Sequence, residues 1–147
     1  MTKLTQPDLV AALRGIDFAM LSTITPFGDV AARPMSNNGE VDYSGTSYYF
    51  TWAAARMVKD IEANPEVGLT FQGSGGIFGK PPTFIFVQGG ADVVTDKAAF
   101  AEHWNPGLDR WFTEGPDTPG VVMLVVTAGR MSYWDGEDSE TFTLPPA

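Results

Sequence analysis

The sequence has no cysteine, one histidine and few basic residues, and each shortage excludes a class of function. Without cysteine the chain forms no disulfide and offers no thiolate for metal binding or catalysis. His103 alone does not build a multi-histidine zinc site within one chain, and we expect no metal. Nine Lys and Arg residues against 18 Asp and Glu leave a formal net charge of −9, which argues against a nucleic-acid partner.

Long apolar runs are also missing from the chain. No run approaches the roughly 20 residues needed to cross a bilayer, so we expect no membrane partner. The N-terminus has neither a basic start nor an apolar signal core, which makes the cytoplasm the expected location. By contrast, 44% hydrophobic and 12% aromatic residues in a 147-residue chain predict one folded domain over residues 1–147. We expect its core at about residues 8–136 and an acidic tail at residues 137–147.

Hydrophobic periodicity and turn residues predict six β-strands and three short helices. Six strands with few helices are typical of a mainly β fold, here a six-stranded antiparallel barrel that is closed or nearly closed. The expected strands are residues 16–24, 29–37, a third ending near residue 51, 67–72, 83–94 and 121–134. The expected helices begin near residue 5 and stop at Gly15, and cover residues 53–63 and 96–104.

Basic residues are concentrated in the first part of the chain, where six of the nine precede Asp92. An aromatic strand ends at Thr51 and leads into a helix carrying Arg56 and Lys59. The amide groups of a helix N-terminus and nearby cations together stabilise a dianion such as phosphate. An ordinary solvated helix face is the alternative for both residues.

Arg33 lies on a predicted strand directly before Pro34. Proline interrupts a sheet ladder, so this strand is predicted to be an edge strand or to carry a bulge. The planar guanidinium presents paired donors that match the oxygens of a phosphate or of a flavin carbonyl. An exposed arginine at the rim of the sheet is the alternative.

A glycine-rich loop at residues 73–82 suggests nucleotide binding, but its spacing does not match. After Gly73–Gly75, Phe78 stands where a dinucleotide fingerprint needs its third glycine. Pro81 follows Lys80 where a phosphate-binding loop needs Ser or Thr. The apolar tip of this loop instead predicts a lid over a ligand site.

Trp134 ends the last predicted strand, where its ring could lie over a ligand ring or fill a dimer interface. An acidic group follows it, formed by Asp135, Glu137, Asp138 and Glu140. Paired-carboxylate or metal chemistry and a solvated acidic end are the two interpretations, and the polar surroundings favour the solvated end. His103, on a short helix, is interpreted as a packing or surface residue rather than a catalyst.

Several short motifs follow one another in a fixed order over about residues 8–136. They are Ala32-Arg33-Pro34-Met35, Tyr49-Phe50-Thr51, the run from Asp60 to Val67, the run from Val87 to Val93, His103-Trp104, Arg110-Trp111-Phe112 and the run from Ser132 to Asp135. This series resembles the pyridoxamine 5'-phosphate oxidase-like FMN-binding split barrels, and in particular their general stress protein 26 branch. The resemblance implies a six-stranded split barrel of the FMN-binding type and a homodimer with two flavin sites at the subunit interface.

The resemblance also implies which residues bind the cofactor. The implied set is Arg33, Pro34, Met35, Phe50, Thr51, Arg56, Lys59 and Trp134. Arg33 and the backbone around it would face the isoalloxazine ring, and Thr51 with the helix that follows would approach the phosphate. Trp134 matches a tryptophan that reaches the flavin site from the other subunit.

Two positions depart from the family pattern. Ala55 stands where a serine is usual, and Met57 stands where a lysine is usual, so a phosphate ligand and a positive charge are missing. Loss of one charged hydrogen bond typically costs roughly 1.5–3 kcal/mol. Arg56 matches a basic phosphate ligand of the oxidase branch, and Lys59 lies one helical turn further on, so either residue could compensate.

Three functions therefore stay open. The first is an FMN-dependent oxidoreductase in which the flavin carries the chemistry and the protein supplies neither a nucleophile nor an obligatory general base. The second is a non-catalytic flavin- or ligand-binding stress or sensor protein with a degraded phosphate site, and the third is a reductase that uses the deazaflavin F420. A vitamin B6 oxidase is a weaker interpretation, because residues 137–147 lack the basic substrate motif of that branch.

Overall fold

The computed structural model describes residues 4–14, 16, 18–36, 45–73, 82–136 and 138–143 of the chain. The predicted lid at residues 73–82 lies, except for its two ends, outside the described residues. The strands are β1 (Phe18–Ile24), β2 (Val30–Ser36), β3 (Thr46–Trp52), β4 (Glu66–Gln72), β5 (Phe84–Val94), β6 (Val121–Asp135) and β7 (Asp138–Thr143). The helices are α1 (Gln6–Arg14), α2 (Arg56–Ala63) and α3 (Lys97–His103), with two 3-10 turns, η2 (Pro106–Arg110) and η3 (Gly115–Asp117).

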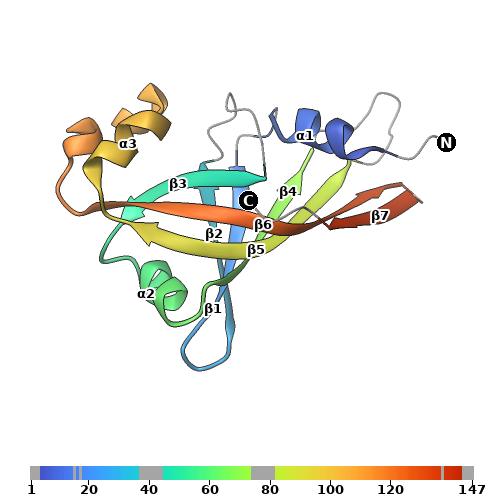
Figure 1. The fold of residues 1–147 in the computed structure, drawn as a ribbon, viewed down its shortest axis with the longest axis horizontal. Coiled ribbons are helices and arrows are strands. Elements are labelled where there is room, and N and C mark those ends of the chain that lie inside the picture. Colours follow the sequence, from blue (N-terminus) through green and yellow to red (C-terminus); the bar gives the residue numbers. More distant parts are fainter. Residues whose placement is uncertain are drawn as a thin grey trace.

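All seven strands belong to one antiparallel sheet in the order β2-β1-β4-β5-β6-β3, and β7 pairs with β6 beyond this path. The sheet is strongly curled, with β1 and β2 crossing the direction of β5 and β6 (Figure 1). Strands β2 and β3 are the two ends of the curled path, and no pairing joins them within the described residues. The predicted mainly β, split-barrel fold is confirmed. Pro34 lies in edge strand β2, as its lack of an N–H predicts.

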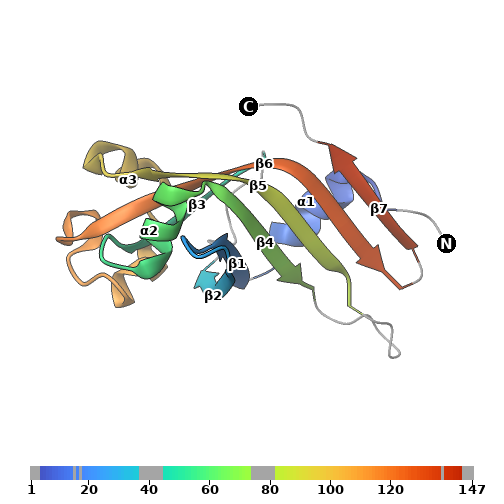
Figure 2. The ribbon, with the colours of Figure 1, turned by 90° about the horizontal axis from the view of Figure 1, so that it is seen from below.

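The acidic tail predicted at residues 137–147 is wrong for residues 138–143. These residues form β7, a seventh strand that folds back on β6, and Figure 2 shows this hairpin at one end of the sheet. Gly136, with φ +66, makes the turn. Phe142 stacks on Tyr133 and packs against the core, so one apolar residue in an otherwise polar strand fixes β7 in place.

The main core fills the inside of the curled sheet. Inward residues alternate along the strands, as with Ala19 and Leu21 on β1, and α1 contributes Leu9 and Leu13. Helix α2 contributes Met57 and Ile61, far from α1 (Figure 1). Alternation with period 2 in the strands and 3.6 in the helices therefore explains which residues are buried.

A second cluster lies on the other face of β3 and β6, beneath α3 and the 3-10 turns, and we call it the aromatic cap. Its buried members are Phe50, Phe100, Leu108, Phe112, Val121 and Met123. The Phe50 ring makes edge contacts with Phe100, at 5.7 Å between centroids, and with Trp104, at 4.7 Å. The Trp104 indole N–H donates to the Asp109 carboxylate at 2.8 Å. The phenylalanine rings carry no polar atom, and the one polar group among these three rings, the Trp104 N–H, has a hydrogen-bond acceptor.

A bulge at Gln88 and Gly89 bends β5 where it passes β6. A Cβ atom at Gly89 would lie 2.1 Å from the Thr127 carbonyl oxygen, which is backbone and does not move aside. Only glycine fits there, and a bulge of this kind bends the strand and increases its local twist.

Candidate functional site

Arg33 does not lie in open solvent at the sheet rim but points to the inner side of β1 and β2. Its side chain is 22% exposed. Nη1 donates to the Thr23 hydroxyl at 2.9 Å and to the Leu21 carbonyl oxygen at 3.3 Å. Nη2 lies 3.6 Å from Asp60 Oδ2. The interpretation as an ordinary rim arginine is therefore wrong.

Asp60 brings helix α2 into this arrangement. Its side chain is 1% exposed, and Oδ2 accepts a hydrogen bond from the Thr23 hydroxyl at 2.9 Å. The other carboxylate oxygen, Oδ1, is buried and has no hydrogen-bond partner among the described residues. A carboxylate in a hydrophobic core is costly unless it is paired, and Arg33 supplies the pairing charge.

Arg56 is the first residue of α2, and it lies near enough to Arg33 to affect the pKa of the Arg33 guanidinium. The pKa of Arg33 is lowered, first by burial of the guanidinium and further by the positive charge of Arg56, while Asp60 opposes the shift. Arg56 itself is exposed. Arg33 is paired with Asp60, and the second guanidinium group, that of Arg56, leaves this group of three side chains with a net positive charge in a protein that is acidic overall.

We call Thr23, Arg33, Arg56 and Asp60 the charged cluster. It lies at the N-terminal end of α2, where Ala55 takes the cap position without a side-chain hydrogen bond. A helix N-terminus that no side chain caps presents free N–H groups to an anion. The combination of two guanidinium groups and such a helix end fits a phosphate group.

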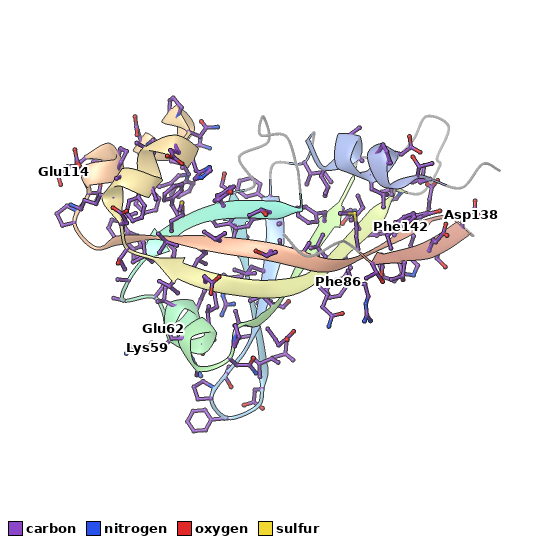
Figure 3. The ribbon with its side chains drawn as sticks, viewed as in Figure 1. Lys59, Glu62, Phe86, Glu114, Asp138 and Phe142 are labelled. Atoms are coloured by element: carbon purple, nitrogen blue, oxygen red, sulfur yellow. The ribbon has the colours of Figure 1, made fainter. Side chains whose placement is uncertain are left out.

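The other positions of α2 divide between core and solvent. Met57 is 5% exposed and packs in the main core. Lys59 projects outward from α2 beside Glu62 (Figure 3). Of the two basic residues predicted on α2, Arg56 is the one whose charge acts on Arg33, and Lys59 points away from α2.

Besides Arg33, four of the predicted residues lie on the two edge strands. Pro34 and Met35 belong to β2, and Phe50 and Thr51 belong to β3. Met35 and Thr51 are each 9% exposed on the inner side, whereas Phe50 packs in the aromatic cap. The Phe50 side chain therefore does not share a pocket with Arg33.

Trp134 lies far from these residues within one chain. It is 47% exposed and pairs with Phe84 near the end of β6. Thr51 pairs with Val122, twelve residues earlier on the same strand. Because a strand rises about 3.3 Å per residue, a small ligand does not reach both Thr51 and Trp134 of one subunit.

The outward face of the sheet carries exposed apolar side chains from several strands. Phe18, Met20, Val30, Phe84 and Trp134 lie on this face by the strand register. The face also holds a shallow groove of about 370 Å³, lined in part by Ser22, Ile24, Val30, Glu66, Phe86 and Gln88. Phe86 points to this side of the sheet (Figure 3).

Gly68 makes room for Phe86 on that face. A Cβ atom at Gly68 would lie 2.8 Å from the Phe86 ring, so only glycine lets the ring lie close against β4. Exposed apolar side chains on β2, β1, β5 and β6 of one sheet face are typical of an interaction surface.

The remaining candidates have structural explanations. The His103 ring stacks on Tyr48 with centroids 3.5 Å apart, in agreement with a packing role. Asp135 of the acidic group is buried and accepts a hydrogen bond from Thr83 at 3.1 Å, so it is not part of a solvated end. The described residues contain no group of three or more His, Cys, Asp or Glu side chains able to hold a metal ion.

Sequence reasoning missed Thr23 and Asp60. Asp60 interrupts the apolar side of α2 between Met57 and Ile61, and an acid on a buried helix face is a signal for a paired charge. Thr23 likewise takes an inward position on β1. Their partner is distant in sequence, so the pattern identifies them as unusual but does not say what they bind.

The fold defines the class of protein. A general stress protein 26-related protein from Clostridium acetobutylicum superposes with a TM-score of 0.77 at 20% identity, covering 91% of this chain and 90% of that one. General stress protein 26 from Bacillus anthracis gives 0.71 at 24% identity, covering 91% and 94%. Both share the fold of this chain.

The sequence profile of the pyridoxamine 5'-phosphate oxidase-like family matches residues 5–145. The chain therefore belongs to this family. A heme binding protein from Mycobacterium smegmatis also shares the fold, with a TM-score of 0.74 at 13% identity, covering 97% of this chain and 60% of that one. No curated protein matches the sequence. None of the described helices has the length and apolar character needed to cross a membrane.

Proposed function

We propose that the protein binds FMN and acts as a flavin-dependent oxidoreductase related to the general stress proteins. The observation that carries this proposal is the charged cluster, in which Arg33 is paired with Asp60 and the positive charge of Arg56 acts on Arg33 at a helix N-terminus that no side chain caps. A phosphate dianion supplies the negative charge that this arrangement lacks.

The phosphate would be held from two sides. Arg56 is exposed at the start of α2, and Arg33 keeps Nε and Nη2 outside any hydrogen bond with the described residues. The first amide groups of α2 complete the set, since no side chain caps them. This arrangement compensates for Ala55 and Met57, which remove the usual serine and lysine.

The flavin ring would lie along the opening between β2 and β3. Edge strands present N–H and C=O groups that no neighbouring strand takes up. Pro34 and Met35 on one edge and Thr51 on the other offer such backbone groups to the polar rim of the ring. When bound, the flavin supplies hydride or electron transfer, and the residues of this chain bind it, orient it and exclude water.

A homodimer would complete the site. The apolar outward face of the sheet suits a second copy, and the exposed Glu66 and Arg130 on it have opposite charges. An isologous interface places such residues of one copy against those of the other. The Trp134 of a second copy could then approach the flavin, which the Trp134 of the same chain does not reach.

A non-catalytic binding protein is the second candidate. The burial of Met57 and the lack of a hydroxyl at Ala55 favour it, because the resemblance implies a lysine and a serine at these two positions of the phosphate site. An F420-using reductase is the third form of the proposal, since a deazaflavin also carries a ring and phosphate.

An absorbance titration with FMN and a reduction assay separate these candidates. Saturable binding, a dimer by light scattering and bleaching of the bound flavin by a nicotinamide donor support the oxidoreductase. Binding without reduction by any donor supports the non-catalytic protein. A dimer that binds F420 but not FMN supports the deazaflavin form.

A further inference from the structure

Thr23 and Asp60 belong to the charged cluster but are not among the groups proposed to contact the FMN phosphate, although both contact Arg33. We infer that Asp60 and Thr23 are positioning residues that fix the Arg33 guanidinium, and the N-terminus of α2, for one phosphate group. This inference rests on the proposed function.

The hydrogen bonds within this group have only one consistent direction. The Thr23 hydroxyl has a single hydrogen, which it donates to Asp60 Oδ2 at 2.9 Å. Its oxygen therefore accepts from Arg33 Nη1, also at 2.9 Å. Together with the contact between Arg33 Nη2 and Asp60 Oδ2 at 3.6 Å, these bonds close a ring of three side chains.

The ring fixes Arg33 on the side away from a ligand. Nη1 uses its two hydrogens on Thr23 and on the Leu21 carbonyl, so the guanidinium plane cannot rotate without breaking both bonds. Nε and the Nη2 hydrogen that does not face Asp60 remain for a further acceptor. A planar donor that is already oriented loses less entropy when it binds phosphate.

The same ring joins two elements that carry the basic residues. Asp60 lies four residues after Arg56, on the same side of α2. Thr23 and Arg33 come from the β1–β2 hairpin. Because Asp60 and Thr23 bond across this junction, they set the spacing between Arg33 and Arg56.

The ionic pair is not needed merely to fill the core. Apolar residues of similar volume are often as stable as a buried ion pair or more so. Neighbouring positions on α2, such as Met57 and Ile61, are apolar and well packed. A carboxylate with one oxygen unpartnered is thus a poor structural choice at this position and a good means of holding an arginine.

Asp60→Asn tests the inference because its two possible effects have opposite signs. The substitution keeps the shape but removes a negative charge. If Asp60 only neutralises the cluster, FMN binds more tightly in the variant. If Asp60 positions Arg33, FMN binds more weakly although the site has become more positive.

The experiment compares the dissociation constants of FMN and riboflavin, which lacks the phosphate, by quenching of flavin fluorescence. The full-length variants are Asp60→Asn, Thr23→Val and Thr23→Ser, and thermal unfolding of each checks the fold. We expect the affinity ratio of FMN to riboflavin to fall about tenfold in Asp60→Asn and severalfold in Thr23→Val. Thr23→Ser keeps the hydroxyl and should restore the ratio.

Three outcomes overturn the inference. They are an unchanged ratio in both Asp60→Asn and Thr23→Val, a ratio that rises in Asp60→Asn, or a lower affinity for both flavins with no change in ratio, which indicates a purely structural role. If Asp60→Asn does not fold, the Thr23→Val and Thr23→Ser pair decides by the same criterion. Failure of the wild-type protein to bind FMN at all contradicts the proposed function, and with it the inference.

Discussion

The charged cluster beneath α2 and the aromatic cap beneath α3 both bury side chains against the same sheet, but with opposite chemistry. The cap packs rings edge to face, and the indole of Trp104 meets Asp109. The cluster instead buries Asp60 with one carboxylate oxygen unpartnered, beside Arg33 and near Arg56. The cap is explained by stability alone. The cluster is not, because a buried ion pair contributes little net stability, and the proposed binding of an anion would account for it.

We expect the largest effect on stability when a ring is removed from the aromatic cap. Phe100 is fully buried and contacts Phe50, so Phe100→Ala should lower the free energy of unfolding by about 3–5 kcal/mol. Urea unfolding measures this loss. Trp111→Ala is the matched control, since Trp111 is 58% exposed and its loss should have a much smaller effect. If folded Phe100→Ala changes the affinity ratio of FMN to riboflavin, the cap is not purely structural.

Removal of Arg33 should affect both stability and binding. Arg33→Ala leaves Asp60 as an unpaired buried charge, and we expect a loss of about 3 kcal/mol in the free energy of unfolding. FMN affinity should fall at least tenfold. Arg33→Lys keeps the charge but not the planar fork, so it should recover stability better than binding. Equal recovery of both would show that charge alone matters.

Arg56→Ala should separate binding from stability. Arg56 is exposed at the start of α2, so the free energy of unfolding should change by less than about 0.5 kcal/mol. FMN affinity should fall about tenfold, with riboflavin affinity unchanged. Lys59→Ala is the matched control on the same helix, and it should weaken FMN binding less because Lys59 projects outward (Figure 3). An equal or larger effect of Lys59→Ala would place the phosphate elsewhere on α2.

The smallest expected effect concerns an exposed carboxylate, in contrast to the buried Asp60. The pKa of Asp8 is lowered from its ordinary value of 3.8, first by the backbone N–H of Thr5 and then by the Thr5 hydroxyl. A lowered pKa in the folded state adds stability above the unfolded value, which is lost as the pH falls through the folded value. Asp8→Asn should therefore flatten the stability profile slightly below pH 3.8. An unchanged acid profile would contradict the contribution of this contact.

The sequence allows the architecture to be predicted well because its strands and helices have clear periods. The six predicted strands and three helices are present, at closely similar bounds. Strand β7 was not predicted, because its residues are mostly polar and only Phe142 packs against the core. Asp135-Gly136 is a hairpin signal that the acidic composition conceals.

The candidate site is less predictable, because its contacts join distant parts of the chain. Arg33 and Arg56 are recognisable as candidate anion ligands from their type and position. Their electrostatic coupling, and the bonds of Arg33 to Thr23 and Asp60, depend on how the β1–β2 hairpin meets α2. No local sequence pattern predicts the contact between the β1–β2 hairpin and α2.

The most direct test of phosphate recognition is a pair of titrations of the wild-type protein with FMN and with riboflavin, under the same conditions. If the charged cluster binds the phosphate, FMN binds at least tenfold more tightly than riboflavin, and added inorganic phosphate weakens FMN binding alone. Equal affinities for FMN and riboflavin, unaffected by phosphate, would contradict the account.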